Sequence, residues 1–176
     1  MADELFLEVF AAHLDRLFNL ARGLTGSPQD AEDLVQETCL RALQGWRRQR
    51  PDDPSPWLAT VCLNTARSSY RKRAVRPVEC EADAWLGAQA DLQADTAQQA
   101  LAHLDVERVR RALQQLPARQ REAITLMDLS GFTAAEVATI LRAPRGTVLA
   151  RVHRGRKALA VLLRDGAEVG DGAAPT

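Results

Sequence analysis

The sequence contains few cysteines and histidines and no spacing that would bind a metal. Its 176 residues include only three cysteines, Cys39, Cys62 and Cys80, which lie far apart and form no Cys-x-x-Cys pair. An odd number of separated cysteines argues against a disulfide framework and indicates reduced thiols. The three histidines are equally scattered. The sequence therefore predicts no metal site and no cofactor.

A basic leader and a long apolar run are also missing. The amino terminus, MADELFLEVF, carries acids where a secretion signal carries positive charge. No apolar run reaches the ~20 residues that cross a bilayer. We expect a cytoplasmic protein without membrane insertion.

Strand patterns are almost absent, and this determines the predicted fold class. No sustained period-two alternation and no hairpin dipeptide lies between apolar runs. Apolar residues recur at helical spacing instead, first in a helix from Leu5 to Leu24 whose core side includes Leu14. We expect an all-α protein of two small helical domains, 1–76 and 105–164, joined by a flexible acidic linker, 77–104, and followed by a disordered tail, 165–176.

The formal net charge is zero, but the charges are segregated along the chain. A zero sum taken alone argues against nucleic acid as a partner. Residues 47–76 hold eight bases and residues 108–164 hold twelve, whereas residues 77–107 hold seven acids and no base. Two basic blocks alternating with acidic ones are not explained by a pure protein-binding adaptor.

Ser27-Pro28 starts the second helix, because serine caps a helix and proline fits its first position. Leucines then occur among acids on the outward face, where they either bind a partner or are covered by a second layer of the fold. The pattern is compatible with both alternatives. The predicted buried stripe is Ala31, Leu34, Val35, Thr38 and Ala42, and the outward face carries Asp33, Gln36, Glu37, Leu40 and Leu43.

Residues 47–56, RRQRPDDPSP, are rich in proline and charge and are predicted to form a loop. Ser55-Pro56 then starts a helix that runs to about Lys72. Its outward face combines arginines with an aromatic ring, which suits single-stranded nucleic acid, although a solvated helix end is the alternative. The predicted buried stripe is Leu58, Val61, Cys62, Thr65 and Ser69, and the outward face is Thr60, Asn64, Arg67 and Arg71, with Tyr70 at its edge.

The stretch from Phe132 to Leu159 has the pattern of a helix-turn-helix. Thr133 and Glu136 form a capping box that starts the first helix, and LRAP at 141–144 ends it. The second helix has a basic face that is predicted to read DNA, while a solvated surface helix is the alternative. Its apolar stripe is Val148, Val152, Gly155, Leu159 and Leu162, and its other side carries Thr147, Ala150, Arg151, Arg154 and Lys157.

Three stretches resemble bacterial sigma factors in order and spacing. GSPQDAEDLVQETCLRAL is similar to region 2.2, WLATVCLNTARSSYRKR to regions 2.3 and 2.4, and LPARQREAITLMDLSGFTAAEVATILRAPRGTVLARVHRGRKAL to region 4. The arrangement resembles the extracytoplasmic-function subgroup. The resemblance implies a non-catalytic subunit that binds core RNA polymerase and promoter DNA, helps to open the DNA, and is paired with an anti-sigma factor.

The resemblance also implies residue roles. The polymerase-docking motif would be Asp33, Leu34, Gln36, Glu37 and Leu40. The −10 element would be held by Asp52, Asp53, Ser55, Asn64, Arg67, Tyr70 and Arg71. The −35 element would be held by Arg145, Thr147, Leu149, Ala150, Arg151, Arg154 and Lys157.

The chain departs from the family pattern at the helix-turn-helix. Arg142 stands where the family usually has a glycine, and Leu149-Ala150 replaces a usual Lys-Ser pair. Promoter preference therefore does not transfer from other members.

Two other functions remain as alternatives. One is a stand-alone helix-turn-helix regulator, which would not need the outward leucines. The other is a DNA-processing enzyme, which would require a nucleophile in a folded catalytic domain that the sequence does not offer.

Overall fold

The computed structural model describes the backbone of residues 2–75 and 97–168 and the side chains of residues 3–72 and 106–164. Most of the predicted linker, 77–104, and of the predicted tail, 165–176, lies outside the described backbone. At both places the helices extend further than the sequence pattern indicated.

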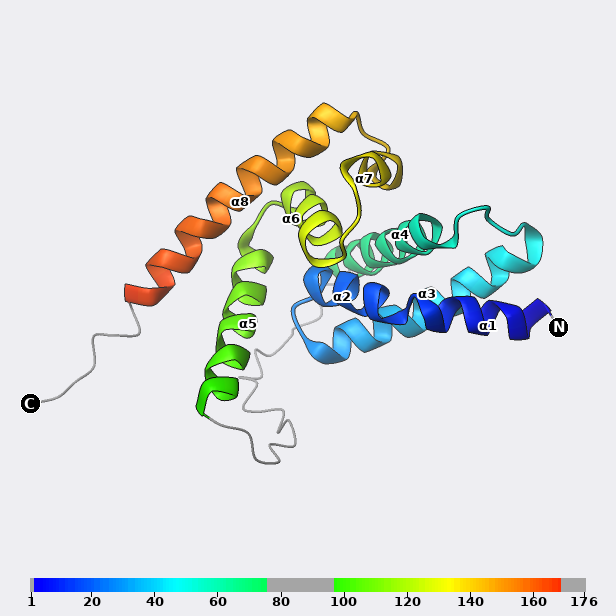
Figure 1. The fold of residues 1–176 in the computed structure, drawn as a ribbon, viewed down its shortest axis with the longest axis horizontal. Helices are drawn as coiled ribbons and strands as arrows, with labels where there is room; N and C mark the ends of the chain where they lie inside the picture. Colours follow the sequence, from blue (N-terminus) through cyan, green and yellow to red (C-terminus); the bar gives the residue numbers. More distant parts are fainter. Residues whose placement is uncertain (1, 76–96, 169–176) are drawn as a thin grey trace, which may run out of the picture.

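Every regular element in the described residues is a helix, as predicted for an all-α protein (Figure 1). The amino-terminal half, residues 2–75, contains α1 (Ala2–Ala12), α2 (Leu14–Leu24), α3 (Pro28–Arg48) and α4 (Pro54–Val75). The carboxy-terminal half, residues 97–168, contains α5 (Ala97–Gln115), α6 (Ala118–Ile124), the π-helix η1 (Thr125–Leu129), α7 (Ala134–Leu141) and α8 (Arg145–Glu168).

The predicted helix from Leu5 to Leu24 is two helices that break at His13. This residue has φ −108° and ψ 3°, and its Nδ1 lies 2.8 Å from the Val9 carbonyl oxygen. The sequence did not reveal the break because the apolar spacing continues across it. Leu14, predicted to be in the core, is 42% exposed.

Two predicted helix starts are confirmed and one is wrong. The Ser27 hydroxyl accepts a hydrogen bond from the Asp30 N–H, and Thr133 and Glu136 form the complete capping box. Helix α4, however, begins at Pro54, two residues before Pro56, the predicted first position. The side chain of Asp53 accepts from the Ser55 N–H at 3.1 Å, so an aspartate caps this helix and proline takes its first position.

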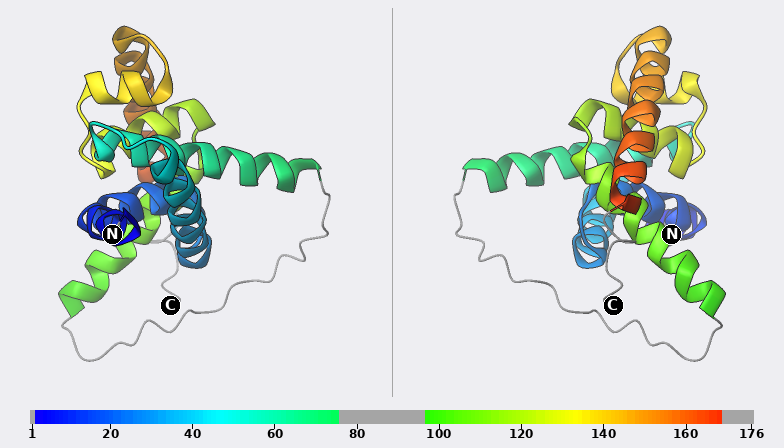
Figure 2. Two further views of the ribbon diagram at one scale, coloured as in Figure 1. Left: turned by 90° about the vertical axis from the view of Figure 1, so that its right-hand side faces the viewer. Right: turned by 90° about the vertical axis from the view of Figure 1, so that its left-hand side faces the viewer.

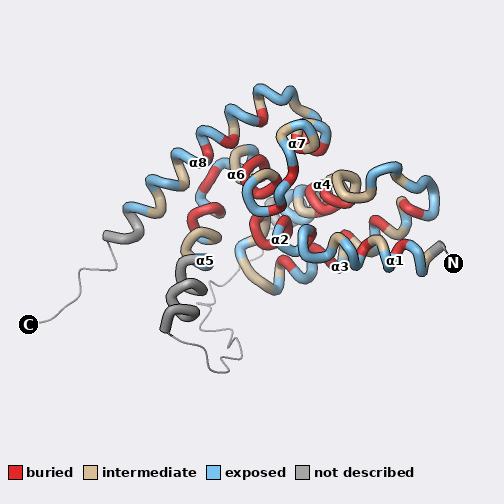
Figure 3. Tube along the Cα trace, in the orientation of Figure 1, coloured by how far each residue is buried: buried red, intermediate tan, exposed pale blue. Residues whose placement is uncertain are grey.

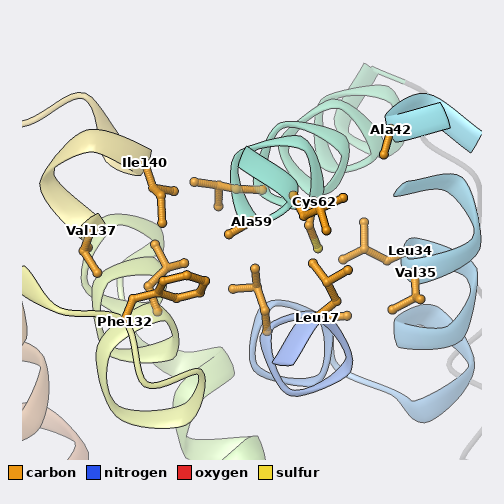
Figure 4. Packing of buried hydrophobic residues seen from close by; sticks show 14 of the residues in the cluster. Leu17, Leu34, Val35, Ala42, Ala59, Cys62, Phe132, Val137 and Ile140 are labelled. Carbon is orange, nitrogen blue, oxygen red and sulfur yellow. The ribbon is translucent and has the colours of Figure 1, made fainter. Parts of the chain in front are cut away.

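One hydrophobic core runs through both halves of the chain. Figure 4 shows Ala59 of α4 on the side of Phe132, Val137 and Ile140 of the carboxy-terminal half, while Leu17 of α2 lies toward Cys62 and Leu34 in the same cluster. The two predicted domains are therefore packed against each other across α2 and α4 (Figure 3). A second, smaller cluster of Leu113, Leu116 and Ile124 joins α5 and α6, with Leu159 and Leu162 of α8 packed against it.

Helix α4 is buried on more sides than predicted. Leu58, Cys62 and Thr65 are buried as expected, whereas Ser69 is exposed. Ala59 and Leu63 are also buried, although they lie outside the predicted stripe. A single amphipathic stripe does not describe this helix because α2 and α3 cover one side of it and α7 covers another.

Helix α8 crosses α6 at Gly155. A Cβ at this position would lie 2.5 Å from Ile124 Cδ1, closer than real Cβ contacts allow. The buried side chains of Val148 and Val152 continue the same face, as predicted. The absence of a side chain at Gly155 thus sets how closely α8 approaches the body of its half.

Replacing Arg142 should test the strain in the helix-turn-helix. Arg142 has φ 50° and ψ 48°, a left-handed conformation that glycine adopts without steric cost. Arg142→Gly should therefore raise the free energy of unfolding by about 0.5–1 kcal/mol in urea denaturation. Lys157→Gly, at an exposed position inside α8, should instead lower it by about 1 kcal/mol. A lower free energy of unfolding in Arg142→Gly than in the wild-type protein would show that the backbone at Arg142 is not strained.

Candidate nucleic-acid and partner interfaces

A cleft of about 1410 Å³ separates parts of the two halves. One wall is formed by α3 and α4, including Asp33, Glu37 and Tyr70. The other wall is formed by α6 and by the turn between α7 and α8, including Arg119 and Arg142. Residues from all three predicted site groups therefore line one cleft, although Arg151 is the one member of the −35 group among them.

The outward face of α3 carries the predicted docking residues. Asp33 and Gln36 are exposed, and Leu40 is 60% exposed, so none of the helices that the structure describes covers it. Glu37 is half-buried and accepts a hydrogen bond from Arg41 Nε at 2.6 Å. The exposure of Leu40 favours the partner-binding alternative.

Two leucines of α3 differ from their predicted positions. Leu34, assigned to the docking set, is only 6% exposed and belongs to the core. It supports the docking face from beneath and does not form part of its surface. Leu43, predicted to point outward, is half-buried and packs against the core, because the face of α3 that meets other helices is wider than the predicted stripe.

Helix α4 presents the predicted single-strand face. Asn64 and Arg71 are exposed, and Tyr70 is 72% exposed. Arg67 donates two hydrogen bonds to Glu122 of α6, with Nε to Oε1 at 2.8 Å and Nη2 to Oε2 at 2.7 Å. This hydrogen-bonded pair raises the pKa of Arg67. The pair spans the two halves, so Arg67 is already engaged within the chain.

The predicted −10 residues in the loop before α4 and in the first turn of that helix differ in their contacts. Asp52 is exposed to solvent. Asp53 caps α4, and the Ser55 hydroxyl accepts from Arg16 Nη1 at 2.8 Å. Arg16 also lies over the ring of Phe132, with Cζ 4.8 Å from the centroid. Asp53 and Ser55 therefore shape the loop, which leaves Asp52 as its free carboxylate.

Helix α8 places most of the predicted duplex-reading residues at the surface. Leu149 and Arg154 are exposed, and Arg151 is half-buried at the edge of the cleft. Arg156, by contrast, is held by Asp128 of η1, with Nε to Oδ2 at 2.9 Å, and this contact raises its pKa. Figure 2 shows α7 and the start of α8 at one end of the molecule, away from α5. The remaining members of the set are Arg145, Ala150 and Lys157, which are exposed, and Thr147, which is half-buried.

Sequence reasoning missed Arg16 and Glu122. Nothing in the sequence near Arg16 indicates contacts with a loop and a ring far along the chain. The sequence contains only a weak indication that Glu122 is important, namely that it is one of only three acids in residues 108–164. Its partner is on another helix in the other half, which no local pattern shows.

The described residues contain no group of three or more His, Cys, Asp or Glu side chains placed to hold a metal ion. Cys39 and Cys62 are free thiols, and burial raises the pKa of Cys62 to about 12. Cys80 lies outside the described residues. Among the helices described, none combines the length and apolar character needed to cross a membrane.

Both halves of the chain match family models of known proteins. Residues 9–76 match the family model of sigma-70 region 2, and residues 106–159 match that of sigma-70 region 4. The ECF RNA polymerase sigma factor EcfG of Rhodopseudomonas palustris is 42% identical over 171 residues, covering 96% of this chain and 90% of its own length.

Two solved structures are similar over nearly the whole chain. The sigma factor RpoE of Bartonella quintana, solved with the anti-sigma factor NepR, is 31% identical with a TM-score of 0.68, covering 92% of this chain and 96% of its own. CnrH, solved with the cytosolic domain of CnrY, is 27% identical with a TM-score of 0.68, covering 93% of this chain and 90% of its own. With both sigma regions present in the expected order, the chain belongs to the extracytoplasmic-function subgroup of the sigma-70 family of RNA polymerase sigma factors.

Proposed function

We propose that this sigma factor binds core RNA polymerase through the outward face of α3, holds the −10 element with α4 and the loop before it, and reads the −35 element with α8. The observation that carries the proposal is the exposed face of α3, where Leu40 lies among acids beside the basic face of α4. A transcription initiation factor of this type supplies binding and orientation, while the polymerase supplies the chemistry.

Asp33, Gln36 and Glu37 offer acids and an amide to a basic partner surface, and Leu40 adds an apolar contact. Exposed apolar side chains with a polar rim are typical of protein interfaces. Leu34 fixes the position of this face from the core.

The −10 face is built for a separated strand. Unstacking a base step costs about a few kcal/mol, which contacts to the displaced base and backbone must offset. Tyr70 offers a ring for stacking, Arg67 and Arg71 offer charge to phosphates, and Asn64 offers hydrogen bonds to a base edge. Asp52 is the loop carboxylate available to accept from a base amino group.

Helix α8 suits the major groove. Arg154 and Lys157 are exposed on the face that also carries Leu149 and Ala150. Apolar side chains at these two positions favour contact with thymine methyl groups, whereas the cations favour phosphates or guanine.

A stand-alone helix-turn-helix regulator is the second candidate. It accounts for α7 and α8 but leaves the exposed Leu40 and the whole sigma region 2 unexplained. One solved relative was determined in complex with the anti-sigma factor NepR, which supports a regulatory partner of that class for this chain. We place the action of this sigma factor in the cytoplasm, where the polymerase works.

In vitro transcription on a promoter library tests the function directly. Core RNA polymerase with the purified chain should produce transcripts from a subset of promoters, and core enzyme alone should not. Duplex binding by the free chain with no transcript from any promoter would favour the stand-alone regulator.

Charge reversal on α3 should remove polymerase binding. Asp33→Lys with Glu37→Lys replaces the acids of the docking face and should abolish co-purification with core enzyme. Glu8→Lys with Asp15→Lys makes the same charge change on exposed residues of α1 and α2 and should leave binding intact. Wild-type recovery of core enzyme by the α3 variant would disprove the docking assignment.

Substitutions of the two loop aspartates should affect different properties of the protein. Asp53→Ala removes the cap of α4 and should lower the free energy of unfolding by about 1 kcal/mol. Asp52→Ala should leave stability unchanged and alter −10 sequence preference in library transcription. An equal stability loss in both variants would argue against this division.

Arg154→Ala should weaken binding to a −35 duplex and flatten its salt dependence, with the slope of log K against log salt reduced by about 0.9 for one lost phosphate contact. Arg156→Ala is the matched control, since Asp128 already holds that guanidinium. A change in sequence preference with an unaltered salt slope would instead assign Arg154 to base reading.

A further inference from the structure

The five-residue loop 49–53, between α3 and α4, is fixed at both of its ends. At its start the Gln49 N–H donates to the carbonyl oxygen of Gly45 at 3.0 Å, and at its end Asp53 caps α4. Loops that carry binding residues depend on the scaffold that holds their ends. The position of the exposed Asp52 side chain therefore follows from where α3 ends and where α4 begins.

Two tryptophan rings join those two helix ends. Trp46 lies in the last turn of α3 and Trp57 in the first turn of α4, with their ring centroids 6.4 Å apart. A Cβ at Gly45 would lie only 3.0 Å from Trp57 Cζ2, so the Trp57 ring packs closely against α3. The buried indole N–H of Trp46 has no hydrogen-bond partner among the residues that the structure describes. Packing against neighbouring rings therefore holds the Trp46 side chain in place.

Helix α1 also contacts Trp46. It lies beside α3 (Figure 1), and its buried Phe6 meets the Trp46 ring edge-on, with centroids 5.8 Å apart and an interplanar angle of 60°. Arg50 of the loop lies over the same Trp46 ring, with Cζ 5.6 Å from the centroid. Trp46 thus connects α1 with α4 and with the loop, so a shift of α1 against α3 also moves the start of the loop.

A surface ion pair joins α1 to the same turn of α3. Arg47 Nε donates to Asp3 Oδ1 at 3.0 Å, and Arg47 Nη2 donates to Asp3 Oδ2. The side chains of Asp3 and Arg47 are 49% and 56% exposed, and exposed ion pairs add little to stability. A bidentate pair instead fixes geometry, because the planar guanidinium and carboxylate groups must align. The pair therefore sets the position of the last turn of α3, directly before the loop.

We propose that α1 sets the precision of −10 recognition, with Asp3 as a positioning residue that acts through Arg47 on the loop 49–53. The ion pair fixes the end of α3, and the Trp46 ring carries that position to the start of the loop. Asp52 then presents its carboxylate at one place relative to the displaced base, while Asp3 itself does not contact DNA in this role. The inference rests on the proposed function, specifically on the assignment of Asp52 to a base of the −10 element.

Library transcription with core polymerase and the full chain tests the role of Asp3. The promoters differ only in single bases of the −10 element, and the readout is the ratio of transcript from the preferred base to transcript from each other base. Asp3→Ala should lower this ratio by about threefold to tenfold at the base that Asp52→Ala affects, because one well-placed base contact discriminates by about tenfold. Asp3→Glu keeps a carboxylate within reach of Arg47 and should restore the ratio.

Glu8→Ala is the matched control, because it removes the same charge from an exposed position of α1 and should keep the wild-type ratio. Circular dichroism and urea denaturation should show wild-type helicity and stability for Asp3→Ala and for the control, since an exposed ion pair adds little stability. The double variant Asp3→Ala with Asp52→Ala should match Asp52→Ala alone, because Asp3 acts through that carboxylate.

The outcomes distinguish this inference from the proposed function. An altered ratio in Asp52→Ala with a wild-type ratio in Asp3→Ala would overturn the inference and leave the proposed function standing. A further loss in the double variant, or an equal loss in Glu8→Ala, would also show that Asp3 does not act by positioning Asp52. A wild-type ratio in Asp52→Ala would instead refute the −10 role of the loop and the inference with it.

Discussion

Burial of α4 on two sides is the interaction on which the rest of the structure depends. Leu58 and Cys62 belong to the core with α2 and α3, while Ala59 meets the residues of α7 and Phe132. Each large apolar side chain buried in this way contributes about 1.5–3 kcal/mol. Because α4 packs against helices of both halves within one core, the two sigma regions pack as one body in this structure.

That packing also determines which charged side chains form ion pairs. A carboxylate as buried as Glu122 requires a cation, and the nearest outward arginine of α4 supplies it. Ion pairs at such a boundary stabilise little in total but select one arrangement over others. The basic blocks of the two halves are consequently partly neutralised by acids within the chain, in keeping with a net charge of zero.

The docking face of α3 depends on the same core in another way. Leu34 and Val35 hold the helix from beneath, and this turns Asp33, Gln36 and Leu40 outward. In the proposed roles, region 2 joins polymerase contact and single-strand contact on the adjacent helices α3 and α4, whereas duplex reading lies on α8 in the carboxy-terminal half.

The sequence by itself determined what depends on local physics: the helical class, the caps at Ser27 and Thr133, the loop before α4 and the exposed side of α8. Its motifs also identified the sigma family, since those motifs are short and contiguous. It did not determine the break at His13, the packing of the half-buried Leu43 against the core or the partner of Arg67. Those features arise from contacts between helices far apart in the chain, where any pairing satisfies the same amphipathic pattern and only tertiary packing selects one.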